Sequence, residues 1–298
     1  MIRIEVPATS ANLGSGFDCL GLALTLYNQV WMEEADGVEI ISRDGLSIPV
    51  DESNLIYWSA KKLYERCSRR LPGLHIEQQS DIPMARGLGS SSACIVAGLL
   101  GANRFLGSPL SMQELVNLAC EIEGHPDNIA PAFLGGLVTS AMEGGRVHSI
   151  SVPVSPKIHF AALIPPFELK TEVARDALPE EYSRRDAVYN LSRSALMTAA
   201  LFSGSLENLR VAVQDRLHQP YRMKFIPGFE TVVRMSYELG SLGTYLSGAG
   251  PTMISIVDDE GVKIFREHAV AHMEEMGISG WRLEILETDP KGARICID

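Results

Sequence analysis

Two periods of apolar and polar residues alternate along the first half of the chain. Short apolar runs and period-two alternation predict strands at residues 3–7, 22–33, 38–42, 74–79, 137–141 and 147–151. A period near 3.6 predicts helices at residues 54–66 and 90–106, and a third helix opens at the capping box Ser111–Glu114 and stops before Gly124 and Pro126. The 90–106 segment is apolar on nearly every face, which is typical of a helix buried inside a domain.

The pattern restarts after two prolines in residues 153–156. Strands are predicted at residues 158–164, 244–247, 253–257, 281–286 and 294–297, and helices near residues 189–203, 206–218, 229–239 and 261–276. We therefore predict two domains, residues 1–155 and 156–298, of the α+β class with mixed sheets.

The composition is that of an acidic globular protein of ordinary hydrophobicity. The 298 residues are 46% apolar and 21% charged, and 26 basic against 37 acidic residues give a net charge of −11. An acidic surface without a basic stripe argues against nucleic-acid binding. It would also repel a free nucleotide, so a nucleotide enzyme with this charge needs a local positive site made by helix N-termini, a few arginines and a divalent cation.

The sequence carries no signal of membrane insertion or secretion. Arg3 and Glu5 interrupt the amino terminus, and the longest apolar stretch, near residues 93–102, is far shorter than the roughly 20 residues that a membrane span needs. The five cysteines form no CxxC pair. This odd number without a metal-binding spacing predicts reduced thiols, no zinc site and a cytoplasmic location.

A glycine- and serine-rich turn at residues 82–93, IPMARGLGSSSA, is the strongest chemical signal. Gly87 and Gly89 allow positive φ and a close approach by a ligand. The turn leads directly into the apolar helix, so its free backbone amides would form an anion site suited to a triphosphate. An ordinary strand-to-helix turn with a serine cap gives a similar pattern, although three consecutive hydroxyls exceed what capping requires.

Two further polar segments give weaker signals. Residues 7–21 follow the first strand and carry Asn12 and Asp18, which can offer an amide and a carboxylate to a small polar substrate; an Asx-rich turn would have the same composition. Residues 247–252, SGAGPT, lie between two predicted strands. Gly248 and Gly250 in this segment indicate backbone packed closely against another segment or a ligand.

Several common catalytic patterns are absent from the sequence. No Gly-Lys dipeptide occurs, which excludes a Walker phosphate loop, and the patterns VAIK, HRD, DFG and GxGxxG are missing too. No GxSxG supports a serine hydrolase. His268 and His272 have a spacing that can bind metal, but without a third ligand we interpret them as residues of a surface helix.

Three of these segments, in this order and spacing, are similar to the three motifs of the GHMP kinases. They are PATSANLGSGFD at residues 7–18, PMARGLGSSSA at 83–93 and LSGAGPT at 246–252. The first resembles the homoserine kinase branch in particular, as do EGHPDNIAP at 123–131, TEVAR at 171–175 and HQPYR at 218–222. The resemblance covers almost the whole chain. It implies an N-terminal ribosomal-S5-like α/β domain that binds ATP, a C-terminal ferredoxin-like domain that closes the cleft and, by analogy only, a homodimer.

The resemblance implies an ATP and Mg²⁺ site at the glycine-rich turn. Ser91 and Glu123 would share the metal ion, with Glu121 as the alternative carboxylate. The turn residues that would wrap the phosphates are Pro83, Met84, Ala85, Arg86, Gly87, Leu88, Gly89, Ser90, Ser91, Ser92 and Ala93.

The resemblance also implies an acceptor, L-homoserine, whose ammonium, carboxylate and hydroxyl need separate partners. Asp18 would bind the ammonium, and Arg175 and Arg222 would hold the carboxylate through forked, charge-assisted hydrogen bonds. The residues that would orient the reactive hydroxyl and its surroundings are Asn12, His125, Asn128 and Thr171. Asn12, Asn128 and Arg175 are expected to act in catalysis.

The implied reaction transfers a phosphoryl group from ATP to L-homoserine, a step towards threonine. Mevalonate-type relatives use a lysine in the first motif and an aspartate base after the glutamate motif, whereas this chain has no lysine before Lys61 and carries Asn128 where the base would be. We therefore expect transfer without a dedicated general base, driven by positioning and charge neutralisation. A GHMP kinase for another small alcohol and a non-catalytic ligand sensor on the same fold are the alternatives.

Overall fold

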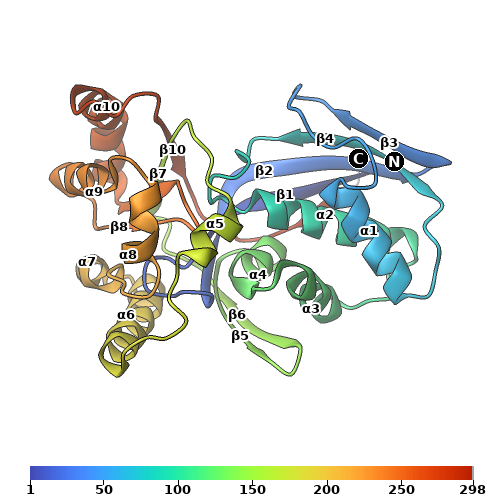
Figure 1. The fold of residues 1–298 in the computed structure, drawn as a ribbon, viewed down its shortest axis with the longest axis horizontal. Helices are drawn as coiled ribbons and strands as arrows, with labels where there is room; N and C mark the ends of the chain where they lie inside the picture. Colours follow the sequence, from blue (N-terminus) through green and yellow to red (C-terminus); the bar gives the residue numbers. More distant parts are fainter. Residues whose placement is uncertain (297–298) are drawn as a thin grey trace.

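The protein is built around two β-sheets, which form two lobes lying side by side (Figure 1). The computed structural model describes residues 1–296, so Ile297, the last residue of the strand predicted at 294–297, lies outside the described residues. Helices and sheets occur in both lobes, which confirms the predicted α+β class. Among the described helices, none has an apolar stretch of the length needed to cross a bilayer.

The first lobe contains a sheet of seven strands. Its main path runs β11–β1–β2–β4–β3, and β5 pairs with β2 while β6 pairs with β5. Only β3 and β4 are parallel among the described pairs, since helix α1 carries the chain back between them. The strands are β1 (Ile2–Ala11), β2 (Leu20–Glu34), β3 (Gly37–Ser42), β4 (Gly73–Ser80), β5 (Leu137–Glu143), β6 (Arg146–Val152) and β11 (Arg294–Cys296).

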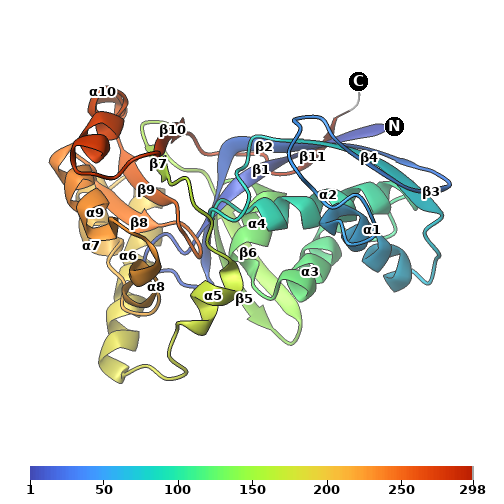
Figure 2. The same cartoon turned by 45° about the horizontal axis from the view of Figure 1, so that its top comes forward.

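Helices cover one face of this sheet (Figure 2). They are α1 (Leu55–Arg66), α2 (Ser90–Phe105), α3 (Met112–Glu123) and α4 (Pro126–Leu134). Helix α2 lies at the centre, in contact with β1, β2 and the other three helices. All of its residues from Ser92 to Asn103 except Cys94 are buried, which confirms the prediction of a helix enclosed by a domain.

The second lobe contains an antiparallel sheet of four strands in the order β10–β7–β9–β8. Alternate residues of β7 face two different cores: Phe160 and Ala162 join the core of the first lobe, whereas Ala161 and Leu163 pack with α9 and α10. The sheet therefore connects the two lobes. Its strands and the surrounding helices are β7 (His159–Ile164), β8 (Gly243–Leu246), β9 (Met253–Val257), β10 (Arg282–Leu286), α5 (Thr171–Asp176), α6 (Arg184–Ser203), α7 (Leu209–Ala212), α8 (Gln219–Arg222), α9 (Phe229–Glu238) and α10 (Asp259–Glu275).

Two prolines at the limits of predicted elements lie inside regular elements of the structure. Strand β1 continues through Pro7 to Ala11, and the register shifts between Pro7 and Ala8, so the strand accommodates a residue without an N–H at an irregularity. Helix α3 does stop at Gly124, which has a φ of 90°. Pro126, however, occupies the first turn of α4, a helix that the sequence did not predict, because a proline nitrogen needs no partner there.

The helix predicted at residues 206–218 is wrong over its second half. The chain forms a 3₁₀ turn, η1 (Leu206–Asn208), and then α7, which ends at Ala212. The carboxylate of Asp215 accepts hydrogen bonds from the backbone N–H groups of the three residues 217–219. Such side-chain-to-backbone bonds favour a turn over a continuing helix. Helix α5 was also missed, since its six residues are too few to show a period.

The last described strand returns from the second lobe to the first. Strand β11 pairs antiparallel with β1, with Ile295 opposite Ile4. The predicted division between residues 155 and 156 falls between β6 and β7, yet residues 294–296 complete the first sheet. The domain limits 1–155 and 156–298 therefore stay a prediction that does not account for this strand.

Candidate active site

The three segments that carry chemical signals in the sequence lie against one another. The hydroxyls of Ser10 and Ser247 share a hydrogen bond of 2.8 Å, and the Ser247 hydroxyl also donates to the carbonyl of Gly87 at 2.6 Å. The backbone N–H of Gly248 donates to the carbonyl of Ala11 at 3.1 Å. These bonds confirm the expectation that residues 247–252 pack closely against other segments.

The glycine-rich turn ends at the N-terminus of α2, and Gly89 is the N-cap residue with a φ of 71°. A Cβ atom at Gly89 would lie 2.0 Å from the Thr9 hydroxyl oxygen, and one at Gly87 would lie 2.3 Å from the Ser247 carbonyl oxygen. No side chain caps this helix, so the ordinary turn with a serine cap is excluded. The first backbone amides of α2 are therefore free of a side-chain cap and available to an anion.

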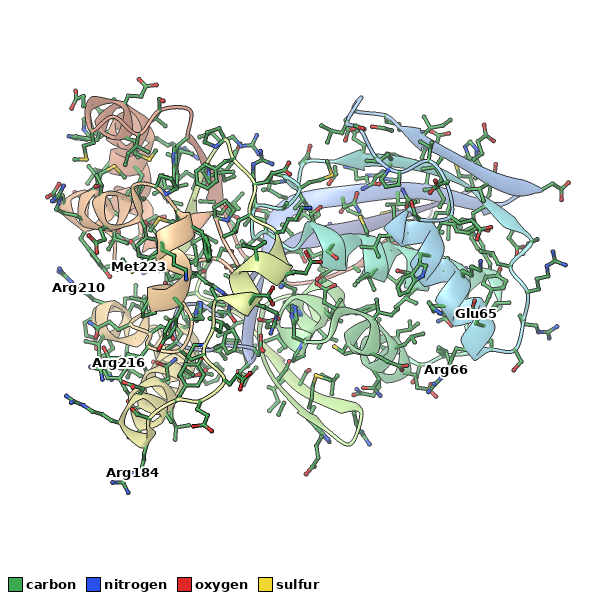
Figure 3. The ribbon with its side chains drawn as sticks, in the orientation of Figure 1. Glu65, Arg66, Arg184, Arg210, Arg216 and Met223 are labelled. Atoms are coloured by element: carbon green, nitrogen blue, oxygen red, sulfur yellow. The ribbon has the colours of Figure 1, made fainter. Side chains whose placement is uncertain are left out.

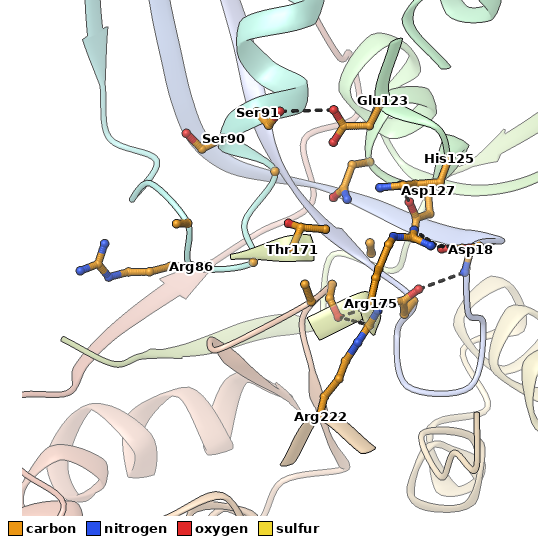
Figure 4. Close-up of a pocket in the computed structure, with 18 residues that line it drawn as sticks. Asp18, Arg86, Ser90, Ser91, Glu123, His125, Asp127, Thr171, Arg175 and Arg222 are labelled. Carbon is orange, nitrogen blue, oxygen red and sulfur yellow. Dashed lines mark hydrogen bonds and ion pairs between the residues drawn. The ribbon is translucent and has the colours of Figure 1, made fainter. Parts of the chain in front are cut away.

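Two serines of the turn point their hydroxyls at a carboxylate from the end of α3. Ser91 donates to Glu123 Oε2 at 3.2 Å (Figure 4). Ser92 donates to Glu123 Oε1 at 3.0 Å. The sequence left Glu121 and Glu123 as alternatives. Glu123 lines the cavity described below, whereas Glu121 is exposed and is absent from its lining. The geometry therefore favours Glu123 as the partner of Ser91.

A cavity of about 100 Å³ lies where these segments meet the second lobe. It brings together residues from both lobes (Figure 4). They come from several elements, among them the first turn of α2, the end of α3, the start of α4 and helices α5 and α8. The predicted site residues that line it are Asn12, Asp18, Ser91, Glu123, His125, Asn128, Thr171, Arg175 and Arg222. Sequence reasoning thus named residues that the fold gathers from distant positions.

A larger cavity of about 590 Å³ adjoins the first and shares Ser90, Ser91 and Glu123 with it. Part of its wall is apolar, formed by Leu46, Ile48, Pro49 and Leu55. The turn residues that line one or both cavities are Met84, Ala85, Arg86, Gly87, Gly89, Ser90 and Ser91. The predicted turn residues that line neither of these two cavities are Pro83, Leu88, Ser92 and Ala93.

Part of the predicted turn set also belongs to the core. Leu88 and Ala93 are completely buried among apolar side chains, and the buried Ser92 is engaged with Glu123. The guanidinium of Arg86 is engaged with the protein itself, since it donates to the backbone carbonyls of Met84, Pro165 and Pro166. It therefore ties the turn to the segment that leads into α5.

Asp18 and Arg175 form a forked ion pair across the cavity. Arg175 Nη2 lies 2.8 Å from Asp18 Oδ1, and Nη1 lies 3.2 Å from Oδ2. The sequence assigned these groups to opposite ends of one substrate, whereas here they satisfy each other. Both side chains remain about one-third exposed, at 36% and 34%, so a zwitterion could reach both charges by separating them.

Arg222 is buried deep in the second lobe and is held by three acceptors. Its Nε donates to the carbonyl of Ala174 at 3.2 Å, and Nη1 lies 3.0 Å from the Gly248 carbonyl and 3.3 Å from His218 Nδ1. Burial, together with the nearby charge of Arg175, lowers the pKa of Arg222 to about 10. The guanidinium is therefore still positive at neutral pH and faces the cavity as a fixed cation.

His218 is a site-supporting residue that sequence reasoning missed. Its Nε2 donates to the carbonyl of Gly14 at 2.6 Å, so Nδ1 carries no proton in the neutral ring and accepts from Arg222. Complete burial lowers the pKa of His218, which favours this neutral form. The HQPYR segment was noticed only for its arginine, although His218 and Arg222 have the i, i+4 spacing of neighbours on one helical turn.

Asp127 is the second residue that the sequence did not single out. Its side chain is 2% exposed, and Oδ1 accepts a 2.6 Å hydrogen bond from Nδ1 of His125. Burial alone would lower the pKa of His125, but the bond to Asp127 and its charge outweigh burial and raise it. Possible ligand atoms of Asp18, His125 and Asp127 lie within 4.8 Å of one another, so this side of the cavity is an anionic recess that suits a cation.

Each of the two predicted catalytic asparagines forms a hydrogen bond through at least one end of its side-chain amide. Asn12 donates from Nδ2 to the Gly248 carbonyl at 3.1 Å and accepts from the Asp18 N–H at 3.0 Å. Asn128 accepts from the Thr9 hydroxyl at 2.8 Å, which leaves its Nδ2 as the donor toward the cavity. Both ends of the Asn12 amide are thus bonded to the protein, which suits a residue that positions its neighbours. Asn128 keeps its Nδ2 group for contact with a ligand.

The histidine pair on α10 lies apart from this site. The rings of His268 and His272 are 6.1 Å apart between centroids, and the His268 side chain is 47% exposed. Within residues 1–296, the group formed by Asp18, His125 and Asp127 is the cluster whose ligand atoms approach closely enough to hold a metal ion.

Comparison with known proteins decides the family. The sequence matches the GHMP kinases N terminal domain over residues 54–136 and the GHMP kinases C terminal domain over residues 197–274. It is 45% identical to the homoserine kinase of Caldicellulosiruptor bescii, with 99% of this chain and 97% of the relative covered. The chain belongs to the GHMP kinases. It is accordingly a phosphotransferase, and the resemblance stated from its motifs is confirmed.

Other GHMP kinases agree in sequence and in fold. The homoserine kinase of Clostridium beijerinckii is 45% identical, with 99% of this chain and 98% of that protein covered. The crystal structure of homoserine kinase from Cytophaga hutchinsonii has a TM-score of 0.85 at 27% identity, and the match covers 99% of this chain and 97% of that one. The predicted two-domain GHMP kinase fold is therefore confirmed.

Proposed function

We propose that the protein transfers the γ-phosphoryl group of ATP to the side-chain hydroxyl of L-homoserine, forming ADP and O-phospho-L-homoserine on the route to threonine. One observation carries the proposal: an uncapped helix N-terminus and a set of opposite charges suited to a zwitterionic amino acid lie in the same cavity. The relatives at 45% identity, which are named homoserine kinases, support this choice of acceptor.

The nucleotide would occupy the larger cavity and reach the smaller one with its phosphates. The apolar wall of Leu46, Ile48, Pro49 and Leu55 suits a flat base. Ser90 and Ser91 line both cavities, so the triphosphate would pass over the first amides of α2. The positive end of the helix dipole favours an anion there without any lysine in the turn.

Ser91 and Glu123 fit the Mg²⁺ ion that accompanies ATP. Both offer oxygen atoms, the hydroxyl and the carboxylate already lie 3.2 Å apart, and both side chains line the two cavities. A hydroxyl, a carboxylate and phosphate oxygens are the donors that Mg²⁺ takes. When bound, the ion would neutralise charge on the phosphates. Glu123, rather than Glu121, is the carboxylate in this proposal.

The acceptor would replace the internal ion pair of the cavity. Its ammonium would contact Asp18, beside the negative recess that Asp127 completes, and its carboxylate would contact Arg175 and Arg222. Arg222 cannot turn away, because the Ala174 and Gly248 carbonyls hold it. This fixed cation would set the orientation of the amino acid, while Arg175 moves from Asp18 to the ligand.

In this proposal, no side chain of the cavity acts as a dedicated general base. The carboxylate of Asp127 is already bonded to His125 at 2.6 Å, and Asn128 cannot take a proton. The hydroxyl oxygen would form its bond to the γ-phosphorus as the bond to the bridging oxygen breaks, and its proton would pass to an oxygen of the transferred group. Positioning and electrostatic stabilisation suffice for phosphoryl transfer of this kind.

A panel of alcohols tests the substrate. The purified protein is given ATP and Mg²⁺ with homoserine, mevalonate, shikimate or galactose, and ADP release and phosphorylated product are measured. We expect homoserine to have the highest kcat/KM by a wide margin. Turnover of another alcohol alone would support a different GHMP kinase, and ATP binding without any phosphorylation would support a ligand sensor.

The Asn128→Ala variant tests the absence of a general base. We expect a modest loss of kcat, about 10-fold, because a single positioning hydrogen bond is removed. A loss of about 10⁴-fold, as on removing an essential acid–base group, would contradict the proposed mechanism without changing the substrate assignment.

A further inference from the structure

The glycine-rich turn of the first lobe is fastened to the second lobe by the side chain of Arg86. Its Nε donates to the carbonyl of Pro165 at 3.2 Å, and its Nη2 donates to the carbonyl of Pro166 at 3.0 Å. Nη1 donates to the carbonyl of Met84 at 2.8 Å, within the turn itself. The planar fork of N–H donors on arginine suits such a group of acceptors. We name these three carbonyl contacts the Arg86 clamp.

A backbone hydrogen bond runs beside the Arg86 clamp. The N–H of Leu169 donates to the carbonyl of Ala85 at 3.0 Å. Ala85 has a φ of 51°, in the left-handed region that residues other than glycine seldom adopt, so its conformation needs support from its surroundings. The buried Leu169 supplies that support. The turn therefore keeps its shape partly because the second lobe holds it.

The segment held by the clamp leads directly into helix α5, which has little packing of its own. Of the six residues of α5, Ala174 is the buried one, and its carbonyl accepts from Nε of Arg222 at 3.2 Å. Helix α5 lies between the two lobes in both views of the ribbon (Figures 1 and 2). Because helices in proteins are stabilised mainly by tertiary packing, a short helix with one buried side chain is positioned by its attachments. These attachments are the Arg86 clamp and Arg222.

Both sides of the clamp contribute residues to the walls of the two cavities. From the turn, Ala85, Ser90 and Ser91 line both cavities. From α5, Thr171 and Arg175 line both cavities as well. A ligand that fixes the turn would therefore also restrict α5, since hydrogen-bond networks of this kind carry energetic coupling between sites.

We propose that Arg86 is a positioning residue that couples the two parts of the site, so that a ligand on the turn strengthens binding of the acceptor beside α5. This inference rests on the proposed function, which assigns the triphosphate to the turn and homoserine to Arg175. A triphosphate would hold the turn in one arrangement, and the clamp would then hold α5 where Arg175 reaches the acceptor carboxylate. Because coupling between binding sites is reciprocal, homoserine raises the affinity for the nucleotide by the same factor.

A direct contact between Arg86 and the phosphates fits the geometry less well. The close-up shows its guanidinium pointing away from Glu123 and Arg175 (Figure 4). Nε, Nη1 and Nη2 all donate to backbone carbonyls, and the side chain is 20% exposed. The carboxylate of Glu168 lies 3.5 Å from Nη1 but is 57% exposed, so this ion pair adds little to the clamp. The carbonyl contacts are therefore the part of the link that carries the coupling.

Calorimetry on the purified full-length chain tests the coupling. The dissociation constant of a non-hydrolysable ATP analogue with Mg²⁺ is measured with and without saturating homoserine. For the wild type, we expect homoserine to lower this constant about 10-fold. For Arg86→Met, we expect the constant without homoserine to rise about threefold and the effect of homoserine to shrink to about twofold or less, because the carbonyl contacts are lost. Arg86→Lys should recover part of the coupling, since an ammonium keeps the charge but lacks the planar fork.

Two control variants separate the clamp from a simple change of charge. Glu168→Gln removes the exposed ion pair and leaves the carbonyl contacts in place. Arg184→Met removes a positive charge at the outer margin of the second lobe, where the side chain points away from the protein (Figure 3). Both variants should keep the wild-type effect of homoserine on nucleotide affinity.

The possible results separate this inference from the proposed function. Equal coupling in the wild type and Arg86→Met, or no coupling in a wild type that binds both ligands, would overturn the inference alone. A rise of about 30-fold or more in the dissociation constant of Arg86→Met without homoserine would show that Arg86 contacts the phosphates, and would also overturn it. A wild type that binds the analogue but not homoserine would overturn the proposed function and this inference with it.

Hydrogen exchange of the wild type tests the route without relying on the folding of a variant. The amides of residues 167–176 are followed by mass spectrometry with and without the ATP analogue and Mg²⁺, in the absence of homoserine. We expect the analogue to slow their exchange about 10-fold, because a fixed turn restricts local opening of α5. In Arg86→Met this slowing should be absent. Unchanged exchange of this segment in the wild type would overturn the inference.

Discussion

The two ends of the candidate active-site cavity are built from different kinds of groups. Backbone groups form one end, and charged side chains form the other. At the end proposed for the phosphates, the Gly87–Gly89 turn and the first amides of α2 would supply the site, so the backbone conformation would carry most of the binding. At the end proposed for the acceptor, Asp18, Arg175 and Arg222 would act through charged side chains from separate segments. A backbone site depends on glycine and tolerates many side-chain changes, whereas a charged site fails when one partner is lost.

The largest expected effect concerns the one carboxylate at the phosphate end. Glu123→Gln should lower kcat by about 10³-fold, because the ligand proposed to share Mg²⁺ with Ser91 loses its charge. The variant should also need a much higher Mg²⁺ concentration for half-maximal rate. Glu121→Gln, two residues earlier on the same helix, is the control and should stay within about threefold of the wild type. Equal losses in both variants would show that neither carboxylate has a specific role.

Loss of a single cation at the proposed acceptor end should affect the KM for homoserine and not the KM for ATP. Arg175→Met should raise the KM for homoserine by about 100-fold and leave the KM for ATP unchanged, because the forked contact with a carboxylate disappears. Arg216→Met is the matched control, since Arg216 forms an ion pair of 3.0 Å with Asp186 and has nearly the same exposure, 37% against 36%. A rise in the KM for ATP in Arg175→Met would argue against the assigned division of the cavity.

The backbone character of the proposed phosphate end can be tested with two glycines of similar φ. Gly89→Ala should lower the free energy of unfolding by about 2–3 kcal/mol and weaken ATP binding, because the added Cβ would lie 2.0 Å from the Thr9 hydroxyl oxygen at a φ of 71°. Gly107 has a φ of 79° and open space around the same position. Gly107→Ala should therefore lose only about 1 kcal/mol and keep its ATP affinity, as measured by denaturant unfolding and calorimetry.

The smallest expected effect concerns the support behind Arg222. His218→Phe removes the acceptor at Nδ1 and should raise the KM for homoserine by about 10-fold with little change in kcat, whereas His218→Gln should recover part of the loss through its amide oxygen. His159→Phe, at an exposed pair with Asp259, is the control. A loss in kcat alone would point to a role other than positioning.

Because His218 is buried, we expect the stability of the fold to depend on pH. Burial lowers the pKa of His218 in the folded protein, so the unfolded chain binds a proton first as the pH falls below about 6.5. The folded state should therefore lose stability on acidification through this range, and His218→Gln should reduce the loss. The raised pKa of His125 acts in the opposite direction, since its contribution is lost as the pH rises, so the comparison of wild type and variant isolates His218.

The sequence predicted elements best where the physical signal was local. The apolar segment at residues 90–106 predicted α2 almost to the residue, and the box Ser111–Glu114 predicted the start of α3, because both signals come from residues that are close together in the sequence. Pro126 misled the prediction, since a proline stops one helix and starts another equally well. Asp215 ended the predicted helix at residues 206–218 through side-chain bonds that no periodicity reveals.

The motifs of the chain were sufficient to determine its family, its nucleotide chemistry and most of the residues around the cavity, because residue type and short-range order carry that information. The tertiary structure alone decided that Glu123 rather than Glu121 meets Ser91, and that Asp18 and Arg175 pair with each other. It also decided that His218 supports Arg222 and that β11 completes the first sheet. Each of these depends on contacts between segments whose distance in space is not encoded in their spacing along the chain.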